Sequence, residues 1–135
     1  MAGYSGTPLW KKLGYEEGVD AYVEGAPKGY GELLGLPADV PVRWAERAGK
    51  GIGFVHLFAK EKFELKAKLA RLRKLLAADG MIWVSWPKKS SGVETDITED
   101  VVREIALPIG LVDIKVCAVD ETWSGLKLMI RKELR

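Results

Sequence analysis

Two almost uninterrupted apolar segments, with a helix-forming segment between them, limit what this chain can fold into. Residues 52–58 (IGFVHLF) and 81–86 (MIWVSW) have the length of strands and few polar positions. Strands have this composition when both faces of their sheet are covered. Between them, residues 61–78 repeat leucine at spacings of four, three and four, which gives a helix one apolar stripe. This strand–helix–strand unit predicts two parallel strands of one sheet.

Shorter segments extend the pattern toward the N-terminus. The sequence predicts a short helix with Thr7 as its N-cap, a strand, a short helical piece and a second strand, at residues 7–13, 19–23, 32–34 and 40–44. Pro41 has no backbone N–H to donate to a neighbouring strand, which suits a position at the edge of the sheet.

The two longer helices carry recognisable end signals. Asp79 and Gly80 close the helix at 61–78, with Gly80 in the place that a C-terminal glycine usually takes. Asp96 and Glu99, three residues apart, form a capping box that predicts a second helix reaching Ile109.

The pattern changes in the last quarter of the chain. Residues 112–118 and 126–130 alternate apolar and polar side chains, which is typical of strands with one solvent-exposed face. Residues 120–125 (DETWSG) join them as a hairpin loop. We therefore predict a single three-layer α/β domain over residues 1–135, with a sheet that is parallel except for the final strand.

Composition narrows the class of protein. The 135 residues are 47% hydrophobic and 30% charged, as in an ordinary globular domain. No apolar run approaches the ~20 residues of a membrane span, and residues 1–14 lack the features of a secretory signal. With a single cysteine, Cys117, and a single histidine, His56, neither an internal disulfide nor a Cys/His metal cluster is expected. We expect a cytoplasmic protein without a metal.

The order of the elements resembles a known fold. A parallel sheet that ends in strand, helix, strand, helix and hairpin resembles the second half of the Rossmann-like methyltransferases, over residues 52–131. The resemblance implies that the last strand lies antiparallel between the two strands that precede it. The phrases FVHLF, WVSWPKKSSGV and TEDVVREIALPIGLVDIKVCAVDETWSGLK also resemble a family of short bacterial proteins of unknown function, which implies this fold and no activity.

The first half departs from those methyltransferases. The resemblance implies a cofactor loop in which an acidic residue precedes closely spaced glycines that approach S-adenosylmethionine. Residues 23–31 (VEGAPKGYG) keep Glu24 and three glycines, but Pro27 and Lys28 interrupt them and the next helix is short. Glu46 stands roughly where an acidic residue would bind ribose hydroxyls. A reduced methyltransferase is therefore the alternative hypothesis, and we expect no cofactor.

Ligands of an open parallel sheet bind outside the carboxyl ends of the strands. Loops 25–31, 59–62 and 87–93 should lie at that edge, and the resemblance implies that loop 120–125 joins them. The candidate ligand-binding residues are Lys28, Gly29, Trp86, Lys88, Lys89, Ser90, Asp120, Glu121 and Trp123.

We expect Lys88 and Trp123 to line one concavity that also receives the loop at 25–31. Lysine stems can lie along an aromatic ring while the ammonium groups bind an anion. In that case Lys88→Ala should weaken anion binding with little effect on stability. In the structural alternative, Lys88 and Lys89 pair with Glu94, Asp96 or Glu121, and Trp123 covers the end of the sheet.

The leading hypothesis is a non-catalytic module that holds a small anionic ligand or a protein partner at this edge. His56 lies within a buried strand, where a lone histidine is usually a core residue with both nitrogens satisfied. Cys117 lies on a strand, where nothing lowers its pKa.

A third hypothesis is nucleic-acid binding through the basic helix at 61–78, where Lys62, Lys66 and Arg73 flank the apolar stripe. A solvated face explains those cations more simply, because nucleic acid also favours interleaved aromatics.

Overall fold

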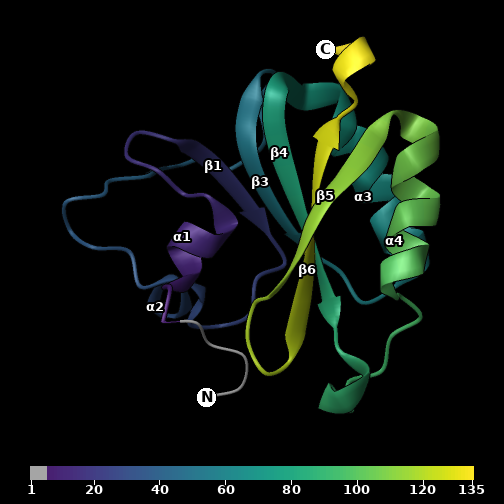
Figure 1. Ribbon diagram of the computed structural model, residues 1–135, viewed down its shortest axis with the longest axis horizontal. Helices are drawn as coiled ribbons and strands as arrows, with labels where there is room; N and C mark the ends of the chain where they lie inside the picture. The colour runs from purple at the N-terminus through teal and green to yellow at the C-terminus, as the bar shows by residue number, and fades with distance from the viewer. Residues whose placement is uncertain (1–5) are drawn as a thin grey trace.

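The computed structural model describes residues 6–135, so residues 1–5 of the predicted domain lie outside it. The described residues form one six-stranded sheet with helices on both sides (Figure 1). The helices are α1 (Leu9–Leu13), α2 (Tyr30–Leu34), α3 (Lys62–Leu75) and α4 (Glu99–Ala106). The strands are β1 (Asp20–Glu24), β2 (Arg43–Trp44), β3 (Ile52–Phe58), β4 (Leu76–Pro87), β5 (Leu111–Ala118) and β6 (Trp123–Ile130).

The strand order is β2-β1-β3-β4-β6-β5. Strands β2, β1, β3 and β4 are parallel, whereas β6 is antiparallel to both of its neighbours, β4 and β5. The last strand therefore lies between the two strands that precede it along the chain. The predicted α/β architecture, with its antiparallel C-terminal strand, is confirmed.

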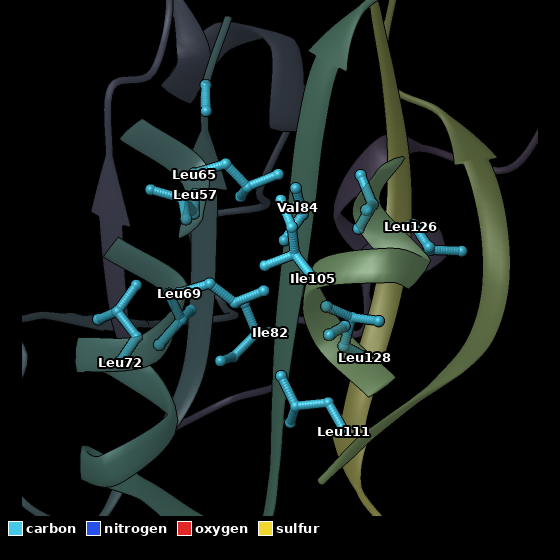
Figure 2. Close-up of a cluster of buried hydrophobic side chains, with 14 of the residues drawn as sticks. Leu57, Leu65, Leu69, Leu72, Ile82, Val84, Ile105, Leu111, Leu126 and Leu128 are labelled. Atoms are coloured by element: carbon cyan, nitrogen blue, oxygen red, sulfur yellow. The ribbon is translucent and has the colours of Figure 1, made fainter. Parts of the chain in front are cut away.

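Strands β3 and β4 are buried on both faces because a separate apolar cluster lies on each side of the sheet. Helices α3 and α4 cover one face, where the leucine stripe of α3 packs against β3 and β4 (Figure 2). The other face carries a second cluster that α1 and α2 help to cover, and it includes Tyr15, Phe54 and Trp83. This double coverage explains why both segments are almost continuously apolar.

The long helix ends earlier than predicted. Helix α3 stops at Leu75 and β4 begins at Leu76, so Asp79 and Gly80 belong to the strand. Leu76 enters the core from the sheet, where it pairs with Ile52. Gly80 is not a helix cap: a Cβ at this position would lie 2.7 Å from Leu76 Cδ1. The glycine instead permits close packing within the irregular start of β4.

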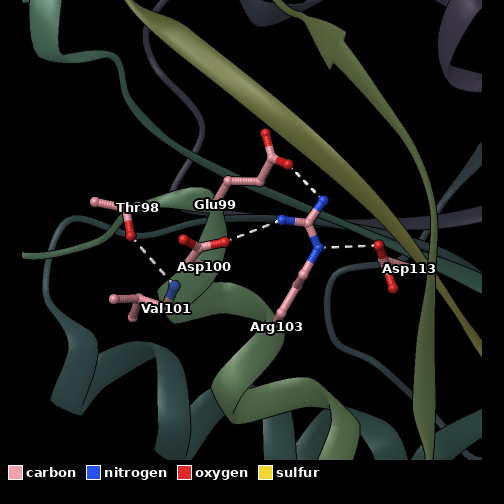
Figure 3. A network of polar contacts seen from close by, with 6 residues as sticks. All are labelled: Thr98, Glu99, Asp100, Val101, Arg103 and Asp113. Atoms are coloured by element: carbon pink, nitrogen blue, oxygen red, sulfur yellow. Dashed lines mark hydrogen bonds and ion pairs between the residues drawn. The ribbon is translucent and has the colours of Figure 1, made fainter.

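The predicted capping box is also wrong. Thr98 is the N-cap of α4, and its Oγ1 accepts a hydrogen bond from the Val101 backbone N–H at 3.2 Å (Figure 3). Asp96 instead accepts a hydrogen bond from the Lys62 backbone N–H at 2.7 Å, and so caps the start of α3. Helix α4 ends at Ala106 and continues as a 3₁₀ turn, Leu107–Ile109.

The N-terminal half contains the expected elements in shortened form. Pro8, rather than Thr7, is the N-cap of α1, and β2 has only two residues at the edge of the sheet. Gly25 follows β1 with φ at 76°, and a Cβ there would lie 2.7 Å from the Phe58 carbonyl oxygen. Only glycine permits this approach of the two backbones. Among residues 6–135, none of the helices has the length and apolar character needed to cross a bilayer.

We expect Gly25→Ala to lower the free energy of unfolding by about 2 kcal/mol or more, because left-handed backbone strains alanine and its Cβ meets Phe58. Gly31→Ala is the matched control. A Cβ at Gly31, within α2, meets nothing within 4 Å. The free energy of unfolding of the Gly31→Ala variant should therefore stay the same or rise by up to ~1 kcal/mol. Urea unfolding measures both variants, and equal losses would contradict this account.

Candidate functional site

The carboxyl end of β4 and the β5–β6 turn meet at one end of the sheet. Pro87 pairs with Trp123 across β4 and β6. Lys88 then donates two hydrogen bonds to the turn, from its backbone N–H to the Thr122 carbonyl at 2.7 Å and from Nζ to the Asp120 carbonyl at 2.6 Å. Lys88 and Trp123 therefore lie at the same edge of the sheet, as the sequence predicts.

The two tryptophans of the predicted site face opposite sides of the sheet. Trp86 packs in the cluster under α3 and α4, whereas Trp123 belongs to the cluster on the side of α1 and α2. There Trp123 meets Phe58, with ring centroids 5.0 Å apart. The register pairs Trp123 with Pro87, and neighbouring residues of a strand point to opposite faces, so Trp86 and Trp123 are separated. The concavity that Lys88 borders at this edge is therefore not lined by Trp123 or by the loop at 25–31.

A concavity of about 380 Å³ lies on the α4 side of this edge. Its lining residues come from the end of β4, the segment before α4 and the start of β6: Trp86, Pro87, Lys88, Lys89, Thr95, Ile97, Thr98, Glu99 and Ser124. Three of the predicted ligand-binding residues are among them, Trp86, Lys88 and Lys89.

The other six predicted residues do not line this concavity. They are Lys28 and Gly29 in the loop before α2, Ser90 in a 3₁₀ turn, and Asp120, Glu121 and Trp123 at the hairpin. Sequence reasoning missed Thr98 and Ser124. Thr98 precedes the acidic first turn of a helix, which was an available N-cap signal. Ser124 could not be found because its place depends on its pairing with Trp86.

Positive charge lies on one side of the concavity. Lys89 is exposed, and its ammonium group has no ion-pair partner among residues 6–135. Lys88 Nζ bonds a carbonyl oxygen rather than a carboxylate. The ion pairs of the structural alternative are therefore not formed in the described residues, and these two lysines remain able to meet an anion.

Arg103 forms ion pairs with the carboxylates on the α4 side of the concavity. Its guanidinium bonds the carboxylates of Glu99, Asp100 and Asp113 (Figure 3). The hydrogen bond from Arg103 is the main reason that the pKa of Asp113 lies below its ordinary value. Glu99 lines the concavity, but this contact directs its carboxylate toward Arg103.

The first turn of α4 adds backbone donors on the same side. Thr98 accepts the Val101 N–H, whereas the N–H groups of Glu99 and Asp100 have no acceptor among residues 6–135. Unsatisfied N–H groups and the helix dipole both favour an anion at the start of a helix.

On the face of the sheet covered by α1 and α2, four buried polar side chains form a connected series of hydrogen bonds. The hydroxyls of Tyr15 and Tyr30 lie 2.7 Å apart, and Tyr30 Oη lies 2.7 Å from His56 Nδ1. His56 Nε2 lies 2.7 Å from Ser85 Oγ. Burial lowers the pKa of His56 to about 3, so the ring is neutral at pH 7. The predicted core role is confirmed, because the ring is fully buried with both nitrogens bonded.

Glu24, the acidic residue before the glycines, already has hydrogen-bond partners within the chain. Glu24 accepts hydrogen bonds from Tyr22 Oη at 2.6 Å, Arg71 at 2.7 Å and Lys68 Nζ at 3.0 Å. Burial acts to raise its pKa, but these three donors outweigh burial and lower the pKa to about 2. Because Gly25 also packs against Phe58, these residues do not fit a cradle for S-adenosylmethionine.

The cations of α3 have structural partners in most cases. Lys68 and Arg71 pair with Glu24, and Arg73 Nε donates to the Ile109 carbonyl at 3.0 Å. These contacts agree with the interpretation that the cations of α3 form a solvated face.

Sequence comparison identifies the family. Residues 53–132 match the family described as "Protein of unknown function (DUF3052)", and the chain belongs to that family. No curated protein matches the sequence.

Several solved structures share this fold, and some of them are described as methyltransferases. A TehB-like SAM-dependent methyltransferase from Corynebacterium glutamicum is 13% identical with a TM-score of 0.57, covering 90% of this chain and 85% of that one. A SAM-dependent methyltransferase from Aquifex aeolicus is 18% identical with a TM-score of 0.58, covering 89% and 86%.

An O-methyltransferase of neocarzinostatin biosynthesis, solved with S-adenosylmethionine, is 13% identical with a TM-score of 0.60. The match covers 96% of this chain but only 51% of that one. At these identities the similarity shows a methyltransferase-like fold and nothing further.

The buried imidazole predicts a loss of stability at mildly acidic pH. The His56 pKa is about 3 in the fold and about 6.5 in the unfolded chain, so below pH 6.5 the unfolded state binds the extra proton. The free energy of unfolding should fall as the pH drops from 6.5 to 5, with a slope that steepens from about 0.7 to nearly 1.4 kcal/mol per pH unit. Glu24 titrates outside this window, because its unfolded pKa is near 4.5.

Urea unfolding at several pH values measures this slope. His56→Gln removes the titrating group and should flatten the profile between pH 6.5 and pH 5. A flat profile in the unsubstituted protein, or an unchanged slope in the variant, would show that His56 is not the group responsible.

Proposed function

We propose that this chain is a binding module that holds a small organic anion in the concavity between the end of β4 and the start of α4. One observation carries the proposal: Lys88 and Lys89, which have no carboxylate partners among residues 6–135, border the same space of about 380 Å³ as Glu99, whose backbone N–H is free at the start of α4. Each of these groups favours an anion, and they converge from separate elements.

The remaining lining suits a small molecule with an apolar part. Trp86 and Ile97 contribute apolar side chains to the lining, and Thr98 and Ser124 belong to the same lining. The volume falls near the lower end of the ~300–1,000 Å³ range of small-molecule pockets. A phosphate or carboxylate group near Lys89, with a compact apolar body against Trp86, matches this distribution.

Binding is favoured over reaction because the single histidine and the single cysteine are badly placed for acid–base or nucleophilic chemistry. His56 is neutral, fully buried and bonded at both nitrogens. Burial raises the pKa of the Cys117 thiol, which reduces its fraction of thiolate. Neither residue lines the concavity.

Lys89→Ala tests the site directly. Isothermal calorimetry and thermal shift with inorganic phosphate, then with a panel of organic phosphates and carboxylates, should identify an anion that binds. At a hundredfold excess over its dissociation constant, that anion should stabilise the protein by about 2.7 kcal/mol. Lys89→Ala should weaken binding of that anion about tenfold or more without lowering the melting temperature of the free protein, because the Lys89 side chain has no ion-pair partner among residues 6–135.

Lys28→Ala is the matched control, since Lys28 is an exposed lysine outside the concavity. Equal weakening by both substitutions would place the anion elsewhere or show a general charge effect.

The structure also changes the expectation for Lys88. Because its ammonium group bonds the Asp120 carbonyl, Lys88→Ala should cost about 1–2 kcal/mol of stability as well as affinity.

The fold favours one second candidate, a reduced S-adenosylmethionine-dependent methyltransferase. The supporting observation is the similarity to solved methyltransferases, including one in complex with that cofactor. Against it, Glu24 is held by Lys68 and Arg71, and Pro27 and Lys28 interrupt the glycines. We rank binding without methyl transfer first for this reason.

Calorimetry with S-adenosylmethionine separates the two candidates. We expect no tight binding, because the loop after β1 is occupied by its own contacts. A dissociation constant in the micromolar range would overturn that expectation and put the methyltransferase candidate first.

A further inference from the structure

A groove of about 300 Å³ lies between α3 and α4, on the outer side of the helical layer. Four apolar or small residues form much of its lining: Ala70, Ile105, Pro108 and Ile109. The α3 wall carries Lys62 and Lys66, whereas the α4 wall carries Glu104. The groove therefore has an apolar interior with opposite charges on its two walls.

An exposed phenylalanine stands beside this groove. The Phe63 side chain is on α3 and the residue is 87% exposed, the most exposed of the large hydrophobic residues among residues 6–135. Phe63 is not itself part of the lining, but it precedes Lys66 by three residues, so it lies next to the stripe of α3 that lines the groove. Exposed aromatic rings of this kind are typical anchors of protein interfaces.

The charges of the two walls are poorly paired within the chain. Lys66 has no ion-pair partner among residues 6–135, and Lys62 reaches Glu104 only at 3.8 Å. The side chains of that pair are 50% and 64% exposed, so the contact contributes little. Lys66 and Glu104 thus remain available to charges from outside.

We propose that this groove is an interface between two copies of the chain related by a twofold axis. Each copy places Phe63 in the groove of the other, and Lys66 of each copy faces Glu104 of the other. A twofold interface repeats every contact, so one surface must carry both members of each complementary pair. The basic α3 wall and the acidic α4 wall meet this condition.

Other occupants fit the groove less well. A nucleic acid would bring phosphates against Glu104, and a strongly acidic protein would meet the same carboxylate. A strongly basic partner would meet Lys62 and Lys66. Only a surface with both signs in the matching arrangement complements the two walls, and a second copy supplies it.

A charge exchange tests the pairing. Sedimentation of the full chain over a range of concentrations should show reversible dimers. Lys66→Glu and Glu104→Lys should each weaken dimerisation about tenfold or more, because like charges then meet across the axis twice. Mixing the two variants should restore the dimer, since the heterodimer pairs the two introduced charges with each other at one contact and the two original charges at the other.

Phe63→Glu tests the apolar anchor and should yield a monomer with an unchanged circular dichroism spectrum. Val116→Glu is the control, because Val116 is also exposed, at 47%, but lies on β5. The proposal is overturned if the unsubstituted protein stays monomeric to its solubility limit. It is also overturned if mixing fails to restore the dimer, or if Val116→Glu dissociates the dimer and Phe63→Glu does not.

Discussion

Ile82, Trp83 and Val84 are consecutive residues of β4, and all three are fully removed from water on alternate faces of the sheet. Burial of such side chains contributes roughly 1.5–3 kcal/mol each, so β4 requires cover on both sides. Helices α3 and α4 supply it on one face. On the other face α1 and α2 help to cover the strand, and Trp83 Nε1 donates a hydrogen bond to the Leu13 carbonyl at 2.7 Å. Helices α3 and α4, the second of which borders the candidate site, are part of this cover.

The polar chain on the second face has the same origin. His56 and Ser85 are residues of the neighbouring strands β3 and β4 in a buried region, so each polar atom needs a protein partner. Tyr15 and Tyr30 extend from two separate segments to complete that set. The N-terminal segments are therefore attached to the sheet by directional bonds as well as by apolar contact.

The fold was predictable from the sequence because its strongest signals are local. Continuous apolar strands indicated a doubly covered sheet, and the change to alternation after residue 111 indicated the hairpin. The end of α3 was not predictable, because Leu76 continues the helical leucine spacing while its place in the core comes from pairing with Ile52. Long-range pairing decided the outcome there.

The candidate site was predictable only in part, for a similar reason. Lys88 and Lys89 were identified from a strand that ends at the carboxyl edge of a parallel sheet. Which side of that edge Trp123 faces depends on the register between β4 and β6. A shift of one residue would exchange the faces, and nothing local in residues 120–125 specifies it. Asp96 shows the same limit, since its bond to Lys62 joins segments that are distant in sequence.

The central position of β6 also affects how the chain reaches its native state during synthesis. β4 and β5 are both made before β6, yet the two are not paired with each other in the finished sheet. While the ribosome is still adding residues 123–130, β4 has an unpaired edge with apolar side chains on both faces. Such an edge is prone to pairing with other chains, and contacts between distant segments also slow folding. We therefore expect the nascent chain to remain aggregation-prone until its last strand has left the exit tunnel.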